Sequence, residues 1–102
     1  MTYGIVSEKS LDFSVRIVNL YKYLTSKKEY IMSKQLLRCG TSIGANIAEA
    51  QRGQSKADFK AKMNIALKEA SETEYWLQLL YRTKYLCTVH CALCTNFYVR
   101  TL

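Results

Sequence analysis

Apolar residues recur three and four positions apart along nearly the whole chain, which is the spacing of helices with one buried face. The first such run starts after Ser7, a suitable N-cap residue, and extends to about Ser26. Its apolar positions are Phe13, Ile17, Leu20, Tyr21 and Leu24. The charged segment 27–29, Lys-Lys-Glu, is expected to form an exposed connection to the next helix.

The second predicted helix, from Ser33 to Arg52, has two different faces, and Gly53 is a natural stop after it. At about 100° per residue, one face is apolar and the other is a short polar row. Ser and Asn are unfavourable in the middle of a helix, so this row predicts contact with a partner; the alternative is a row that is simply exposed. Small residues beside the row would let another backbone approach closely. The apolar face contains Leu36, Gly40, Ile43 and Ile47, and the polar row contains Arg38, Ser42, Asn46 and Glu49.

A third helix is predicted from Ser55 to about Lys84, because Ser55 followed by Asp58 resembles a capping box. Glu74 falls in the middle of its apolar stripe. A carboxylate on an apolar face needs a cation, hydrogen bonds or protonation, and Arg38 is the preferred partner. The alternative places Glu74 at the edge of the stripe or in a wet groove.

The segment from about Leu86 to the end is apolar nearly all round and predicts a fourth helix. Cys87, His90, Cys91 and Cys94 lie on one face of it, but one straight helix cannot wrap four ligands around a zinc ion. We therefore expect core packing rather than a metal site, and thiols rather than disulfides. Four helices joined by short links favour a single domain, residues 1–102, folded as an all-α antiparallel up-and-down four-helix bundle.

Fifteen Lys and Arg against eight Asp and Glu give a formal charge of +7, which favours acidic partners such as nucleic acid. A generic basic surface explains the same excess. No apolar run is long enough to span a membrane and no signal peptide is apparent, so a cytoplasmic location is expected.

Sequence motifs for catalysis are missing: His90 is the single histidine, and neither a nucleophile elbow nor a glycine-rich phosphate loop occurs. We expect no enzyme, no catalytic residue and no cofactor. Aromatic residues near the end of the third helix would suit base stacking, but at helical spacing they are more often core or subunit contacts. They are Tyr75, Trp76, Tyr81 and Tyr85.

Two motifs resemble those of the bacterial 23S rRNA intervening-sequence proteins. Residues 38–50, Arg-Cys-Gly-Thr-Ser-Ile-Gly-Ala-Asn-Ile-Ala-Glu-Ala, are similar to the family pattern Arg-Ser-x-x-Ser-x-x-x-Asn-Ile-Ala-Glu-Gly, and residues 70–77 are similar to its second motif. The departures are Cys39, Gly40 and Ala50, where the family more usually has Ser, Ala and Gly. The matching polar positions are Arg38, Ser42, Asn46, Glu49, Ser71 and Glu74.

The resemblance implies a four-helix bundle that assembles into a homopentamer, without an assigned reaction. It also implies kinship with accessory proteins of diversity-generating retroelements, which bind nucleic acid and a reverse transcriptase. The leading hypothesis is a non-enzymatic oligomeric scaffold that binds RNA or another polyanion, with phosphate contacts at Lys34, Arg52 and Lys56. The alternative is a protein-interaction adaptor without nucleic-acid binding.

Overall fold

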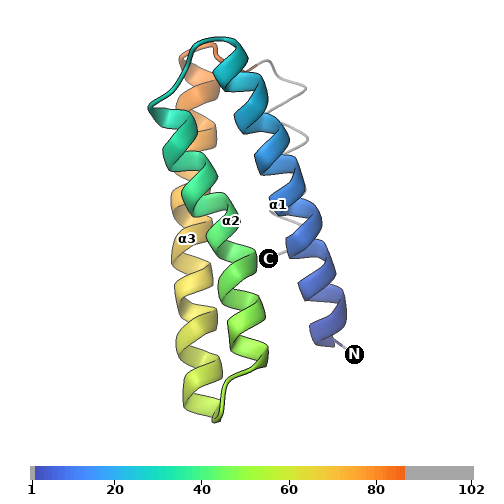
Figure 1. Ribbon diagram of the computed structural model, residues 1–102. Helices are drawn as coiled ribbons and strands as arrows, with labels where there is room; N and C mark the ends of the chain where they lie inside the picture. Colours follow the sequence, from blue (N-terminus) through green and yellow to red (C-terminus); the bar gives the residue numbers. More distant parts are fainter. Residues whose placement is uncertain (1, 87–102) are drawn as a thin grey trace.

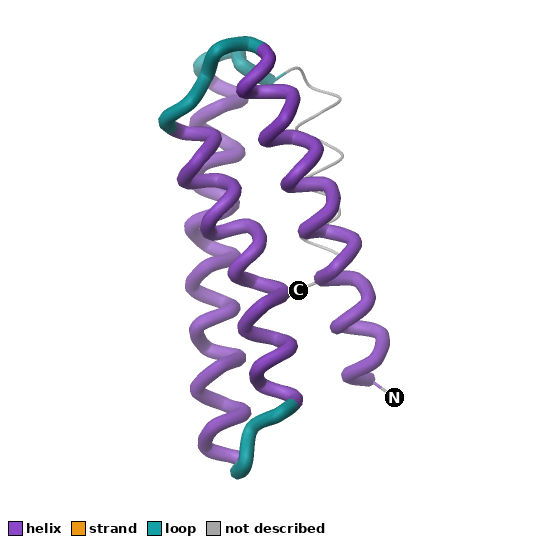
Figure 2. Tube along the Cα trace, viewed as in Figure 1, coloured by secondary structure: helices purple, strands orange, loops and turns teal. Residues whose placement is uncertain are grey.

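Three helices form the part of the chain that the computed structural model describes, residues 2–86 (Figure 1). They are α1 (Thr2–Ser26), α2 (Met32–Gln51) and α3 (Lys56–Arg82). Within this range the tube shows helices and short loops and no strand, which confirms the predicted all-helical class (Figure 2). Successive helices are antiparallel, and α1 and α3 each pack on α2; within residues 2–86 no Cα atom of α1 lies within 8 Å of a Cα atom of α3. The predicted fourth helix and its cysteines lie outside the described residues.

The helix α1 begins at Thr2, earlier than the predicted start after Ser7. Val6 packs against the core, and Ser10, one turn later, is buried, so the inward stripe extends back past Ser7. Ser7 therefore lies inside the helix, where its carbonyl accepts a hydrogen bond of 2.8 Å from Ser10 Oγ. A serine that would suit an N-cap position is here an ordinary helical residue.

Glu29 caps the start of α2, and its predicted place in an exposed connection is wrong. Ile31 stands at the N-cap position and offers no side-chain acceptor. Glu29 Oε1 accepts from the Ser33 amide at 2.7 Å, and Oε2 accepts from the amides of Ile31 and Met32 at 3.3 and 3.2 Å. Only 6% of Glu29 is exposed, because the carboxylate replaces water for amides that have no partner within the helix.

Lysines in left-handed backbone conformation end both α1 and α3. Lys28 has φ 65° and Lys84 has φ 68°. In each case the next residue donates its amide to a carbonyl five positions earlier, Glu29 to Leu24 and Tyr85 to Leu80, both at 3.0 Å. These are Schellman motifs, in which glycine is the usual residue at the left-handed position. The antiparallel arrangement brings both motifs to the same end of the molecule (Figure 1).

The start of α3 is as predicted. Ser55 Oγ accepts from the Asp58 amide at 3.1 Å, and Asp58 Oδ2 accepts from the Gln54 amide at 3.3 Å. The reciprocal bond thus reaches one residue beyond the usual capping box. The helix ends at Arg82, two residues before the expected Lys84, because the Schellman motif takes over there.

The core lies between the three helices, and the predicted apolar face of α2 is part of it: Leu36, Ile43 and Ile47 are buried. Gly40 is buried where Ile17 of α1 packs on α2. A Cβ atom placed on Gly40 would lie 2.8 Å from both Cγ atoms of Ile17. The small residues of α2 therefore admit α1 of the same chain at this point. None of the described helices has the length and apolar character needed to cross a membrane.

Candidate functional site

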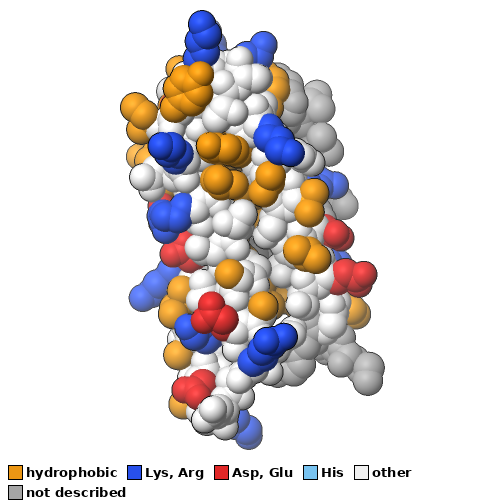
Figure 3. All heavy atoms as spheres, viewed as in Figure 1, with side chains coloured by type: hydrophobic (Ala, Val, Ile, Leu, Met, Phe, Trp, Pro, Cys, Tyr) orange, Lys and Arg blue, Asp and Glu red, His pale blue; other side chains and the backbone are white. Residues whose placement is uncertain are grey.

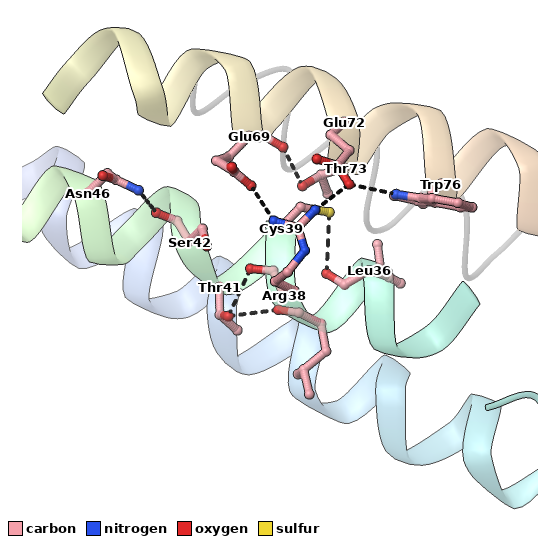
Figure 4. Close-up of polar contacts among 11 residues, drawn as sticks. Leu36, Arg38, Cys39, Thr41, Ser42, Asn46, Glu69, Glu72, Thr73 and Trp76 are labelled. Atoms are coloured by element: carbon pink, nitrogen blue, oxygen red, sulfur yellow. Dashed lines mark hydrogen bonds and ion pairs between the residues drawn. The ribbon is translucent and has the colours of Figure 1, made fainter. Parts of the chain in front are cut away.

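The polar row of α2 contacts α3 through Arg38 (Figure 4). The Arg38 guanidinium donates to Glu72 and, at 3.5 Å, to Glu69. Its side chain remains 52% exposed, so the pairs lie at the surface, where such contacts contribute little to stability. With two carboxylates around one guanidinium, this cluster has no excess positive charge to offer a phosphate.

Glu72 joins the cation to the only tryptophan of the chain. The Trp76 indole Nε1–H donates to Glu72 Oε2 at 3.0 Å, and Arg38 donates to the same oxygen (Figure 4). The hydrogen bonds from Trp76 and from Arg38 hold the pKa of Glu72 below its usual value. The shared oxygen fixes the Trp76 ring against α3 while Arg38 reaches across from α2.

The predicted pairing of Arg38 with Glu74 is wrong. Arg38 faces Glu69 and Glu72, which are three residues apart and lie on one side of α3. Glu74 is two residues further along, about 200° around the helix from Glu72, and cannot face the same guanidinium. Glu74 is half-buried, as expected for the edge of the apolar stripe.

We expect Trp76→Phe to raise the pKa of Glu72 toward the usual glutamate value of 4.5. A lowered pKa means that the charged form is stabilised in the folded state; this contribution is complete above about pH 4.5 and is lost as the pH falls through the folded-state pKa. An NMR titration of the Glu72 carboxyl carbon measures the shift. Tyr75→Phe is the control, because Tyr75 contacts Trp76 edge-on at 5.2 Å without touching the carboxylate hydrogen bond. An unchanged Glu72 titration in Trp76→Phe would contradict the assignment.

The other motif residues bind within or between α2 and α3. Asn46 Nδ2 donates to the Ser42 carbonyl at 2.8 Å, and Ser71 Oγ donates to the Leu67 carbonyl at 3.3 Å. Glu49 accepts from Lys62 of α3 at 2.7 Å. The two ends of the polar row, Arg38 and Glu49, thus meet charged residues of α3, so the predicted partner of the row is in part the neighbouring helix.

Cys39 adds a buried thiol beside this row. It is fully buried, and its Sγ donates to the Leu36 carbonyl at 3.6 Å. Burial raises the pKa of the Cys39 thiol, with a hydrogen bond to Thr73 acting in the opposite direction. A buried, protonated thiol is a packing group and not a nucleophile. No cluster of three or more metal-ligating side chains occurs within residues 2–86, and the predicted packing of Cys87, Cys91 and Cys94 lies outside them.

A second polar surface lies at the end of the molecule where α1 ends, α2 begins and α3 ends. We call it the basic end and define it by six exposed cations: Lys22, Lys27, Lys28, Lys34, Arg82 and Lys84. The only acid in segments 22–36 and 78–86 is Glu29, which is buried under the α2 amides. In the space-filling view this end, at the top, shows blue cations and no red carboxylate, whereas red appears lower down (Figure 3).

The family model for the 23S rRNA-intervening sequence protein matches residues 4–97. The chain belongs to this family. A solved structure from Bacteroides thetaiotaomicron, described as a protein of unknown function from the S23 ribosomal protein family, is 59% identical with a TM-score of 0.92. The alignment covers 94% of this chain and 90% of that chain. A search of curated proteins found no match.

In this member of the 23S rRNA-intervening sequence family, the three predicted phosphate contacts do not share one surface. Lys34 lies at the basic end, whereas Arg52 and Lys56 flank the opposite loop. Eighteen helical steps separate Lys34 from Arg52, about 27 Å. At the opposite end Lys62 is paired with Glu49, and Asp58 adds a further carboxylate.

Sequence reasoning missed most of the basic end of this family member. Some of its cations are far from Lys34 in the sequence, and others are separated from it by the acid Glu29. The cations that were missed are Lys22, Lys27, Lys28, Arg82 and Lys84. A usable signal was present, because antiparallel helices bring the residues after the first helix and those at the end of the third to one end of a bundle. The four aromatic residues considered for base stacking differ in exposure. Trp76 is packed on the core, whereas Tyr75, Tyr81 and Tyr85 are exposed.

Proposed function

We propose that this protein is a non-enzymatic oligomeric scaffold that binds RNA or another polyanion through its basic surface. The observation that supports this most directly is that the basic end exposes cations while its one acidic side chain is buried. None of its six cations forms an ion pair with a residue in the described range, and its single carboxylate is engaged with backbone amides. Unpaired exposed cations can release condensed counterions from a nucleic acid, which drives binding.

Assembly belongs to the same proposal. The family resemblance implies five copies. Because each chain has a formal charge of +7, the assembly would combine five basic surfaces. The side chains of Ile5, Leu11 and Val15 on α1 are each more than half exposed and offer apolar area for a subunit contact. The proposal also includes a fourth helix, formed by the segment after residue 86, that completes an antiparallel bundle. The supporting observation is that α1 and α3 line one core while their Cα atoms stay more than 8 Å apart in the described part.

Binding to a labelled RNA should weaken steeply with salt. If about four phosphates are neutralised, affinity falls about 100-fold between roughly 50 and 200 mM monovalent salt. Fluorescence anisotropy measures the dissociation constant at each salt concentration. A flat salt response, or no binding at the lowest concentration, would contradict the electrostatic mechanism. Native mass spectrometry of protein purified at low salt without nuclease tests the assembly, and a clean monomer would count against it.

A protein-interaction adaptor is the second candidate, and the same exposed apolar positions of α1 favour it. Affinity purification with and without nuclease separates the two. Loss of the co-purified material after nuclease treatment supports the nucleic-acid scaffold, whereas a protein partner retained after RNA is destroyed supports the adaptor.

A further inference from the structure

Two lysines occupy backbone positions at the basic end where glycine would be the more stable residue. Lys28 and Lys84 have φ values of 65° and 68°, and each stands at the left-handed position of a Schellman motif. A residue with a Cβ atom is strained in this conformation relative to glycine. The fold therefore gains nothing from lysine here that glycine would not supply. Both side chains are exposed, and neither forms an ion pair with any described residue.

Exposed tyrosines follow each of these lysines. Tyr30 comes two residues after Lys28 and is 54% exposed, and Tyr85 comes directly after Lys84 and is 38% exposed. The two helix ends thus repeat one arrangement, a strained cation and then an accessible ring. Tyr81, one turn before Tyr85, is also exposed.

Cations interleaved with accessible aromatic rings select a particular kind of polyanion. Cations alone bind duplex and single strands through the phosphates, but bases in a duplex are stacked on each other and present no face to a side chain. A single strand offers both a phosphate and a free base at each nucleotide. We propose that the basic end binds single-stranded RNA, with phosphates on Lys28 and Lys84 and unpaired bases stacked on Tyr30 and Tyr85; this rests on the proposed function.

The remaining contacts of this end support that assignment. The Glu29 carboxylate is buried and accepts hydrogen bonds from three amides. It therefore does not compete with a phosphate for Lys28 and Lys84. Lys27 lies 5.7 Å from the centre of the Tyr23 ring, a cation–π contact that holds a further cation at this end. The opposite end has cations, but the single aromatic residue of its described segment 48–62 is Phe59, which is half-buried and not exposed like Tyr30 and Tyr85.

Fluorescence anisotropy with a labelled single-stranded oligonucleotide of about twelve uridines, and with an RNA duplex of the same length, tests the proposal. The double variant Lys28→Gly/Lys84→Gly should bind the single strand about tenfold more weakly while its thermal unfolding midpoint stays equal or rises. The log–log salt slope should fall by about 1.4, or 0.7 for each phosphate that the variant no longer neutralises. A variant that is at least as stable and binds less cannot be explained by misfolding.

Two further variants complete the experiment. Tyr30→Leu/Tyr85→Leu should weaken single-strand binding by at least about 30-fold and leave duplex binding and the salt slope unchanged. Lys60→Gln/Lys68→Gln removes the same charge from the surface of α3 away from the basic end and should change binding less than twofold. Equal losses from the two lysine pairs, or no effect of the tyrosine pair, would overturn the assignment of the basic end while leaving RNA binding intact. No binding to either RNA at low salt would instead overturn the proposed function.

Discussion

Replacing Glu29 with alanine should lower the free energy of unfolding by about 2–3 kcal/mol. The substitution leaves the amides of Ile31, Met32 and Ser33 without their present acceptor, and the N-cap residue Ile31 has no side chain to replace it. Loss of a single N-cap acceptor costs about 1 kcal/mol, and unsatisfied buried donors cost about 1–3 kcal/mol each where water cannot reach them. The measurement is urea unfolding followed by circular dichroism.

Glu29→Gln and Glu8→Ala are the matched variants for this prediction. Glutamine keeps one acceptor oxygen, so the free energy of unfolding of Glu29→Gln should lie between those of Glu29→Ala and the wild type. Glu8 is an exposed acid on α1, so Glu8→Ala should change stability by less than about 0.5 kcal/mol. If Glu29→Ala is no more destabilising than Glu8→Ala, the capping role is refuted.

Gly40→Ala should destabilise the fold by about 2 kcal/mol even though alanine is the better helix former. The added Cβ atom would lie 2.8 Å from Cγ1 and Cγ2 of Ile17 and 3.0 Å from its Cδ1. Two of these atoms are at the branch of a fully buried side chain, which cannot swing away. Overpacking of this kind costs about 1–3 kcal/mol, which exceeds the gain of up to about 1 kcal/mol in helix propensity.

A double-mutant cycle with Ile17→Ala isolates the contact. Ile17→Ala alone should cost about 3 kcal/mol, and Gly40→Ala in that background should cost nothing or stabilise, because the clashing atoms are gone. Gly4→Ala serves as the control, since a Cβ atom at Gly4 meets nothing within 4 Å. Additive effects of Ile17→Ala and Gly40→Ala would show that the strain has another source.

The elements that the sequence predicts well are those in which local chemistry decides the outcome. Ser55 caps α3 as expected, because its partner Asp58 is three residues away and no other part of the chain is needed. Leu36, Ile43 and Ile47 are buried as expected, because a period of 3.6 residues places them on one face. The all-helical class follows from the same periodicity repeated along the chain.

The predictions that failed depend on groups whose role is set by a neighbouring element. Glu29 looked like part of a charged loop, and only the absence of a polar residue at Ile31 hinted that α2 needed an acceptor from outside the helix. Arg38 had three glutamates of α3 within reach in principle, and the choice of Glu69 and Glu72 over Glu74 depends on the rotation of α3 about its axis. The phosphate contacts Lys34, Arg52 and Lys56 stay a prediction; the helix length alone could have shown that they lie at two ends.

Because Trp76 donates a hydrogen bond to Glu72, its intrinsic fluorescence can report on the contact between α2 and α3. Trp76 is the single tryptophan of the chain, and its indole N–H rests on the carboxylate that Arg38 also holds from α2. Indole emission responds to a charge at this distance, so separation of α2 from α3 changes the fluorescence of one known ring. Unfolding can then be followed at this site in the unlabelled protein, and each of the variants above leaves the chromophore in place except Trp76→Phe.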